Sequence, residues 1–112
     1  MWSVVANGMA EFLDGIGVSF LRVGYAYLLT AADFYRDGWP VGPPLIVEVA
    51  RLHHRNSGYV RRKIGWTLQY IEKTQEGRVL FPDGCQNFYA CLEKLLFRAL
   101  HPKVALDSGR EW

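Results

Sequence analysis

The stretch GYVRRKIGWTLQYIEK, residues 58–73, has the most regular hydrophobic pattern in the chain. Four apolar residues recur there at intervals of three and four positions, which places them on one face of an α-helix. These residues are Val60, Ile64, Leu68 and Ile71. Ser57 is of a type favoured at helix N-caps, so the pattern predicts a helix over 58–73 that begins after a Ser57 cap.

Glycine and proline mark the breaks around this helix, above all in DGWPVGPP, residues 37–44. The predicted helices span residues 3–14, 18–36, 44–54, 58–73 and about 86–100. RVLF, residues 78–81, is typical of a strand, and the Pro-Asp-Gly that follows predicts a turn. Residues 76–92 also fit a β-hairpin, or a helix capped at Asp83, and these alternatives stay open. The predicted fold class is therefore mainly α, a compact domain of five helices with one short β element.

Each predicted helix contributes apolar residues to one shared core. The residues expected to face it are Val5, Met9, Phe12, Leu13, Phe20, Leu21, Tyr27, Leu28, Phe34, Leu45, Val49, Leu52, Phe88, Leu92, Leu95 and Ala99. Cys91 is expected to lie among them as a small buried hydrophobe. At 112 residues, half of them hydrophobic, the chain is predicted to form a single helical domain over 1–112.

The one candidate membrane segment is GIGVSFLRVGYAYLLTAA, residues 15–32. A spanning helix needs about 20 mostly apolar residues, and Arg22 in the middle would be costly in a bilayer. A buried helix is therefore predicted, and no membrane partner. No basic leader precedes the segment. If residues 85–91 are helical, Cys85 and Cys91 lie nearly two turns apart, too far for a disulfide, whereas in a hairpin they could approach each other. A cytoplasmic protein with reduced thiols is expected.

Positive charge is concentrated in the middle of the chain, although the net charge is only +2. Five cations fall within residues 51–63 without one acidic residue: Arg51, Arg55, Arg61, Arg62 and Lys63. Such a block is typical of a surface that faces an anion, and a solvated helix face has the same composition. Projection at 100° per residue places Arg61 and Arg62 opposite the apolar face of the helix. Gly65 and Gln69 fall on the same outer side.

The middle of the chain contains PPLIVEVARLHHRNSGYVRRKIGWTLQYIEK, residues 43–73, and then GRVLFPDG, residues 77–84. Together these two segments make the middle of the chain resemble the winged-helix family of DNA-binding proteins. Two helices joined by a short turn, the second one basic, are the outline of a helix-turn-helix, here at about 44–73. GRVLFPDG would supply the first strand and the tip of a wing. The resemblance implies that helix 58–73 enters the major groove of duplex DNA by its N-terminal part.

The resemblance also implies roles for individual side chains. Arg61 and Arg62 would meet guanine edges, because a planar guanidinium recognises O6 and N7 together. The other residues expected at the nucleic acid are Arg55, Ser57, Lys63 and, on the wing, Arg78. Arg55 and Arg78 would contact phosphate, which positions a protein without reading sequence.

Cations and aromatic rings alternate along a second flank of the same helix. Its members are Tyr59, Arg62, Lys63, Trp66, Tyr70 and Lys73. Tyr, Trp and Arg dominate the energetics of protein interfaces, and rings between cations also suit stacking on unpaired bases. Packing of Trp66 and Tyr70 against the N-terminal helices is the simplest explanation. If the flank binds a protein instead, the expected contacts are Tyr59, Trp66, Tyr70 and Trp39.

Reactive residues show no catalytic or metal-binding spacing. The histidines and cysteines form no CxxC, HxxxH or HExxH motif: His53, His54, His101, Cys85 and Cys91. Nothing in the pattern ties a cysteine to a histidine and an orienting carboxylate. No cofactor, no metal and no enzymatic activity are therefore expected.

Two hypotheses on function remain. The first is a small intracellular DNA-binding protein, such as a transcriptional regulator. The alternative is a non-enzymatic interaction module, such as a viral or phage inhibitor or adaptor, that uses the aromatic and basic helix flank. A homodimer is predicted in either case, because the apolar first third of the chain exceeds what one small core can hide.

Overall fold

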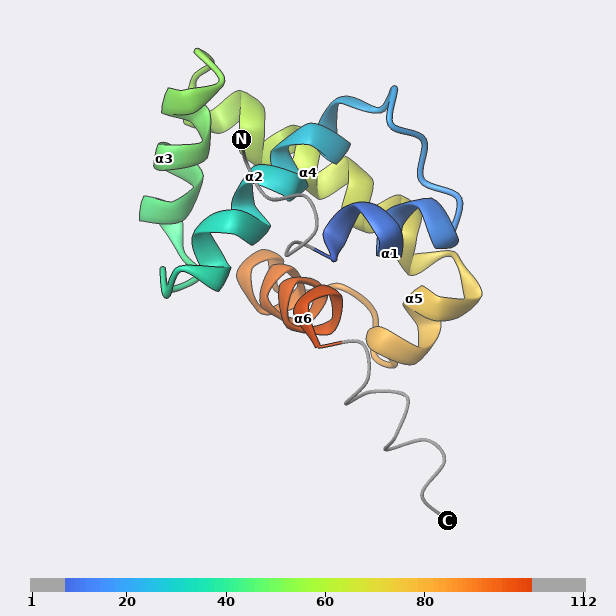
Figure 1. The fold of residues 1–112 in the computed structure, drawn as a ribbon. Helices are drawn as coiled ribbons and strands as arrows, with labels where there is room; N and C mark the ends of the chain where they lie inside the picture. Colours follow the sequence, from blue (N-terminus) through green and yellow to red (C-terminus); the bar gives the residue numbers. More distant parts are fainter. Residues whose placement is uncertain (1–7, 102–112) are drawn as a thin grey trace.

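All the elements that the computed structural model describes, over residues 8–101, are helices. They are α1 (Met9–Gly15), α2 (Val23–Arg36), α3 (Pro43–Leu52), α4 (Ser57–Glu72), α5 (Gln75–Leu80) and α6 (Phe88–Leu100) (Figure 1). The predicted mainly α fold class is confirmed. The described range holds six helices instead of the five predicted, and no strand.

The central element is α4, which packs against α2, α3, α5 and α6, while α1 packs against α2 and α6. Figure 1 shows α3 at one side of the molecule and α5 at the other, with α2 and α4 between them. The four residues predicted to form the apolar face of α4 are all buried. Because each such side chain stabilises the fold by about 1.5–3 kcal/mol when fully buried, this face fixes how α4 lies in the molecule.

The crossing of α2 and α4 is close because Gly24 stands at the contact. A Cβ atom on Gly24 would press against Thr67 Oγ1 and would lie 2.8 Å from the carbonyl oxygen of Lys63. Thr67 is itself buried, and its hydroxyl donates to the same Lys63 oxygen at 3.0 Å. Only a residue without a side chain lets the two backbones approach this far.

A short turn joins α3 to α4 and fixes where α4 begins. His54 adopts φ 56°, a left-handed conformation, which lets the amide of Arg55 donate to the Ala50 carbonyl at 3.0 Å. Asn56 then caps α4, because its side-chain oxygen accepts from the Tyr59 amide at 2.8 Å. The predicted Ser57 cap is wrong by one residue: Ser57 is the first residue of the helix.

The predicted core is largely confirmed. Nine of the sixteen residues predicted from the other helices are buried: Met9, Leu13, Tyr27, Leu28, Leu45, Val49, Leu92, Leu95 and Ala99. Cys91 is buried as predicted, whereas Phe12, Phe34 and Phe88 are half-buried. Val5 lies outside the described residues.

Three of the predicted core residues are exposed: Phe20, Leu21 and Leu52. The first two were placed in a helix over 18–36, but α2 begins only at Val23. Gly17, at φ 88°, ends the α1 region, and residues 18–22 form a non-helical connection whose buried apolar residue is Val18. Leu52 is the last residue of α3 and lies next to the turn, where its side chain is exposed.

The predicted strand at 78–81 is wrong. Residues 75–80 form α5, with Thr74 as the N-cap, whose hydroxyl accepts from the Gly77 amide at 2.9 Å. Gly77 packs directly against the backbone of Ile71 at the end of α4, where no side chain fits. The helical turn therefore follows from the cap and from this close contact, which override the strand preference of Val79 and its neighbours. No wing strand exists in the described part of the chain.

Candidate nucleic-acid interface

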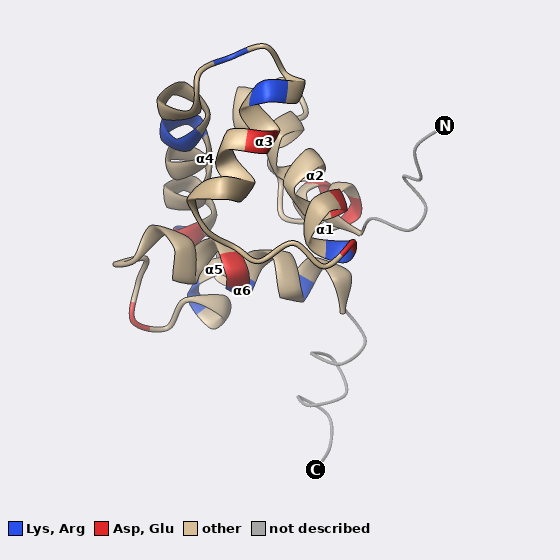
Figure 2. Ribbon diagram, turned by 90° about the vertical axis from the view of Figure 1, so that its left-hand side faces the viewer, with Lys and Arg blue, Asp and Glu red and all other residues tan. Residues whose placement is uncertain are grey.

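Four of the five cations of the predicted basic block gather around the N-terminal half of α4. We name them the basic cluster: Arg55, Arg61, Arg62 and Lys63. The three arginines are exposed, and Lys63 is half-buried. Figure 2 shows the Lys and Arg segments of α4, of the loop before it and of the end of α3 at the end of the molecule where α3 and α4 meet.

The basic cluster has no carboxylate partner among residues 8–101. The ion pairs in that range join Arg36 to Asp33 and Asp37, and Arg51 to Glu48. Arg51, the fifth cation of the block, is therefore neutralised locally. The four cations of the cluster keep their full charge available for an anion from outside the described fold.

Tyr59 holds three members of the basic cluster together. The charged groups of Arg55, Lys63 and Arg62 lie 5.0, 5.1 and 5.7 Å from the centre of its ring. The ring is fixed in turn by an edge-on contact with Tyr27, with centroids 6.4 Å apart. Each cation–π contact at an exposed site stabilises by about 0.5–1 kcal/mol, which offsets part of the repulsion between neighbouring cations.

Arg61 lies on a separate aromatic support. Its guanidinium stands 4.4 Å from the ring centre of Phe88 and 5.7 Å from that of Tyr89, at the start of α6. A guanidinium stacked on a ring keeps its hydrogen-bonding edge free for a phosphate or a base. The packing of α6 against α4 therefore positions Arg61, a role for Phe88 that the helical pattern alone did not reveal.

A pocket of about 330 Å³ lies beside the basic cluster, between α4 and the segment before α6. Its lining residues are Arg61, Arg62, Gly65, Trp66, Leu68, Gln69, Cys85, Gln86 and Phe88. Gly65 and Gln69, which were predicted to share the outer side of the helix with the arginines, both line it. The pocket thus combines the guanidinium groups of Arg61 and Arg62 on α4 with two carboxamides, Gln69 on α4 and Gln86 before α6, which can donate and accept hydrogen bonds.

The remaining residues expected at the nucleic acid differ in position. Ser57 is half-buried in the first turn of α4, next to the cluster. Arg78 is exposed on α5, and its guanidinium donates to the carbonyl of Lys73 at 3.4 Å. Lys73, the C-cap of α4, is ten positions beyond Lys63, about 15 Å along the helix, so Arg78 does not join the basic cluster.

The aromatic residues expected at a protein interface do not form one surface. Trp66 is 51% exposed, with the Lys63 ammonium 4.3 Å from its ring centre. Tyr70 lies on the same flank, where its hydroxyl donates to the Gly17 carbonyl at 3.4 Å. Tyr59 is half-buried beneath the cations. Trp39 packs on Phe34 at 5.1 Å and lines a different pocket with Phe97 and Leu100.

Histidine and cysteine side chains build no metal site in residues 8–101, where no three potential ligands converge. Burial, and then the neighbouring His54, lower the pKa of His53, whose Nε2 lies 2.8 Å from the Thr30 hydroxyl. Burial and a hydrogen bond with the Cys91 thiol raise the pKa of Cys85 to about 12. The Cys85 thiol is therefore protonated at neutral pH and is a poor nucleophile.

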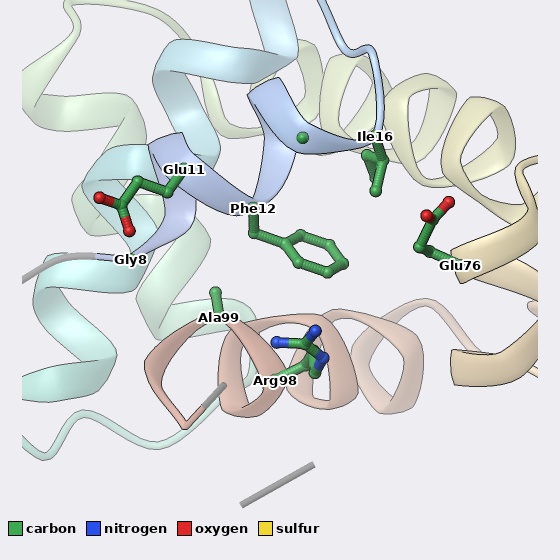
Figure 3. Close-up of a pocket in the computed structure, with 8 residues that line it drawn as sticks. Gly8, Glu11, Phe12, Ile16, Glu76, Arg98 and Ala99 are labelled. Atoms are coloured by element: carbon green, nitrogen blue, oxygen red, sulfur yellow. The ribbon is translucent and has the colours of Figure 1, made fainter. Parts of the chain in front are cut away.

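A second pocket, of about 310 Å³, lies between α1, α5 and α6 (Figure 3). Arg98 is placed under the Phe12 ring, 5.0 Å from its centre, and Glu76 lies across the pocket from them (Figure 3). Its lining residues come from segments far apart in the sequence, so no local motif could have revealed it. Glu11 and Glu76 carry charge opposite to that of Arg98, and this mixture selects neither an anion nor a cation.

No helix in the described range has the length and the apolar character that crossing a membrane requires. Comparisons of the chain with models of known protein families, with curated proteins and with solved structures found no match.

Proposed function

We propose that this protein binds nucleic acid through the basic cluster, with duplex DNA as the form that the surface fits best. The observation that carries the proposal is the gathering of four cations around the first half of α4, with no carboxylate partner among residues 8–101. Phosphate backbones attract such a cluster at any sequence, and this attraction supplies most of the affinity of non-specific binding.

The helix pair supports duplex DNA as the ligand. A turn over residues 53–56 joins α3 to α4, which is the connection that a helix-turn-helix uses. In that arrangement α4 is the recognition helix, and its exposed Arg61 and Arg62 meet base edges while Arg55 meets phosphate. We therefore propose DNA binding through a helix-turn-helix without a wing. Arg78, which was expected on the wing, is not part of the proposed interface. A protein that binds DNA acts inside the cell, and the proposal includes that location.

The test is fluorescence anisotropy with a labelled 20-base-pair duplex and the matching single strand, at about 50 and 200 mM salt. If the four cations each displace a counterion, the affinity for the duplex falls about a hundredfold over that salt step. Arg55→Gln/Arg62→Gln removes two of the charges without reversing them, and we expect a weaker affinity and a shallower salt dependence.

Arg78→Gln is the matched control for Arg62→Gln alone, because each removes one exposed arginine and only Arg62 belongs to the cluster. Equal losses in the two variants would contradict the proposed footprint, and the absence of duplex binding at low salt would contradict the function. Stronger binding of the single strand than of the duplex would mean that the basic cluster binds nucleic acid by stacking unpaired bases on the exposed rings. It would contradict binding through a helix-turn-helix.

The alternative function is a protein–protein interaction module without enzymatic activity. The observation that favours it is the exposure of Trp66, since tryptophan is the residue most enriched at the energetic centres of interfaces. In this case the duplex does not bind, and the variant Trp66→Ala abolishes binding of a protein partner while Arg55→Gln/Arg62→Gln has a smaller effect.

A further inference from the structure

A groove runs between the start of α2 and the outer flank of α4. We name it the α2–α4 groove; it has a volume of about 430 Å³ and is lined by Ser19, Leu21, Arg22, Val23, Gly24, Lys63, Trp66 and Thr67. Trp66 separates it from the pocket beside the basic cluster, because this side chain lines both hollows.

The walls of the groove are apolar and uncovered. Leu21 is 78% exposed, and Val23 and Trp66 are exposed as well. Nothing in the described part of the chain packs over them, although apolar side chains gathered on one surface mark sites of protein association. A phosphate backbone would gain nothing from Leu21 and Val23, so nucleic acid is a poorer occupant of this groove than a polypeptide.

The wall that carries Leu21 is held in place by hydrogen bonds. The Leu21 amide donates to Ser19 Oγ and the Arg22 amide to the Ser19 carbonyl, both at 3.0 Å. The Val18 amide donates to the Leu13 carbonyl at 2.9 Å, which ties the connection to α1. A wall that is ordered before binding reduces the entropy lost when a partner docks.

The rim of the groove is positively charged. Arg22 stands 4.4 Å from the ring centre of Tyr70, Lys63 stands 4.3 Å from that of Trp66, and neither pairs with a carboxylate in residues 8–101. In a symmetric dimer through this groove the same patch would face itself and bring these cations together. The charge therefore favours a different, acidic partner over a second copy of the chain.

We infer that the α2–α4 groove binds an acidic amphipathic helix of a partner protein, which inserts an apolar side chain beside Trp66 and places carboxylates at Arg22 and Lys63. A helix is the expected form because the described residues offer no strand edge to which an extended peptide could add. A flat lipid surface would leave the concave groove unfilled. The inference gives the alternative function a site and a class of partner, and it does not depend on DNA binding.

The test starts from a displayed library of 16-residue helical peptides with randomised faces, selected on the full chain. We expect the enriched peptides to be amphipathic and acidic, and to shift the Trp66 indole signal in NMR spectra of the ¹⁵N-labelled protein. Failure to enrich any peptide, or enrichment of basic or neutral ones, would overturn the inference, as would shifts confined to another surface.

Variants then locate the binding energy of an enriched peptide. We expect Trp66→Ala to weaken binding at least thirtyfold, the loss seen at interface centres, and Arg22→Gln to weaken it several-fold with a reduced salt dependence. Leu21→Ser is compared with Val79→Ser, because the two aliphatic side chains are 78% and 79% exposed and only Leu21 lines the groove. Equal effects of these two substitutions would contradict the site.

Two further outcomes identify a different occupant. Sedimentation equilibrium that shows a dimer lost on Leu21→Ser would mean that a second copy covers the groove. Binding of vesicles that contain phosphatidylserine, abolished by the same substitution, would mean that a membrane surface does. Each result would overturn the inference and leave the duplex DNA measurement to decide the proposed function separately.

Discussion

Substitution of Gly24 by alanine tests the packing that positions α4. The new Cβ would meet Thr67 Oγ1 and would lie 2.8 Å from the Lys63 carbonyl oxygen. The hydroxyl can turn away, but the carbonyl belongs to the middle of α4 and moves only if the helix does. Overpacking of this kind costs about 1–3 kcal/mol, whereas the higher helix propensity of alanine returns at most about 1 kcal/mol. We expect a net loss of about 1–2 kcal/mol in the free energy of unfolding.

The assay is urea unfolding followed by circular dichroism, with Gly65→Ala as the matched control. Gly65 also lies in a helix, but the nearest atom to its added Cβ, Cε1 of Phe88, is 3.9 Å away. Without a clash, alanine should stabilise the protein by about 0.5–1 kcal/mol. The two substitutions are therefore expected to have opposite signs. A Gly24→Ala variant as stable as the wild type would refute the close crossing of α2 and α4.

Three further predictions concern the turn before α4. His54→Gly should stabilise the protein by up to about 1 kcal/mol, because glycine adopts the left-handed conformation of this residue (φ 56°) without strain. A loss of stability in urea unfolding would contradict this prediction and would mean that the His54 side chain makes a stabilising contact. Asn56→Ala removes the side-chain cap on the Tyr59 amide and should lower the free energy of unfolding by about 1 kcal/mol, whereas Asn56→Asp should retain most of the stability. An unchanged unfolding midpoint in the alanine variant would contradict the cap. Burial and His54 lower the pKa of His53, so the folded state favours its neutral form. This contribution to stability is complete above the unfolded pKa of about 6.5 and is lost as the pH falls through the lower folded pKa. The free energy of unfolding, measured at pH 7.5, 6.5 and 5.5, should therefore fall with pH, and it should fall less steeply in the variant His53→Gln. The same dependence on pH in the variant and the wild type would contradict the role of His53.

The helices were predictable where one face is apolar at regular spacing. The core face of α4 follows directly from Val60, Ile64 and Ile71, because burial of that face decides the orientation of the helix. Its cap was misassigned by one residue, since Asn56 and Ser57 are both capping types and only the position of the Tyr59 amide selects between them.

Apolar composition without periodicity was a poor guide. Phe20 and Leu21 belong to a run that predicts a buried helix, yet the connection from α1 to α2 turns them outward. The strand preference of residues 78–81 was likewise overridden, because Thr74 caps a helical turn and Gly77 packs on Ile71. Both errors arise from contacts between segments, which local propensity does not contain.

The candidate site was predictable in part. The cations of the basic block and their exposure follow from the helical projection, since the buried face of α4 leaves Arg61 and Arg62 on the other side. Their aromatic supports were not predictable, because Phe88 reaches Arg61 from another helix. The α2–α4 groove could not be predicted either, because it is lined by Leu21 and Trp66, which are 45 positions apart in the sequence.

The most direct test of the basic cluster as a DNA interface is an NMR titration of the ¹⁵N-labelled full chain with a 12-base-pair duplex at about 50 mM salt. We expect the largest shifts at the amides of residues 55–63, and smaller ones at α5 and at residues 19–24. Reversal of these shifts at about 300 mM salt would follow from the release of counterions. Shifts centred on α5 or on the α2–α4 groove, or no shifts at low salt, would contradict the assignment of α4 as the helix that meets DNA.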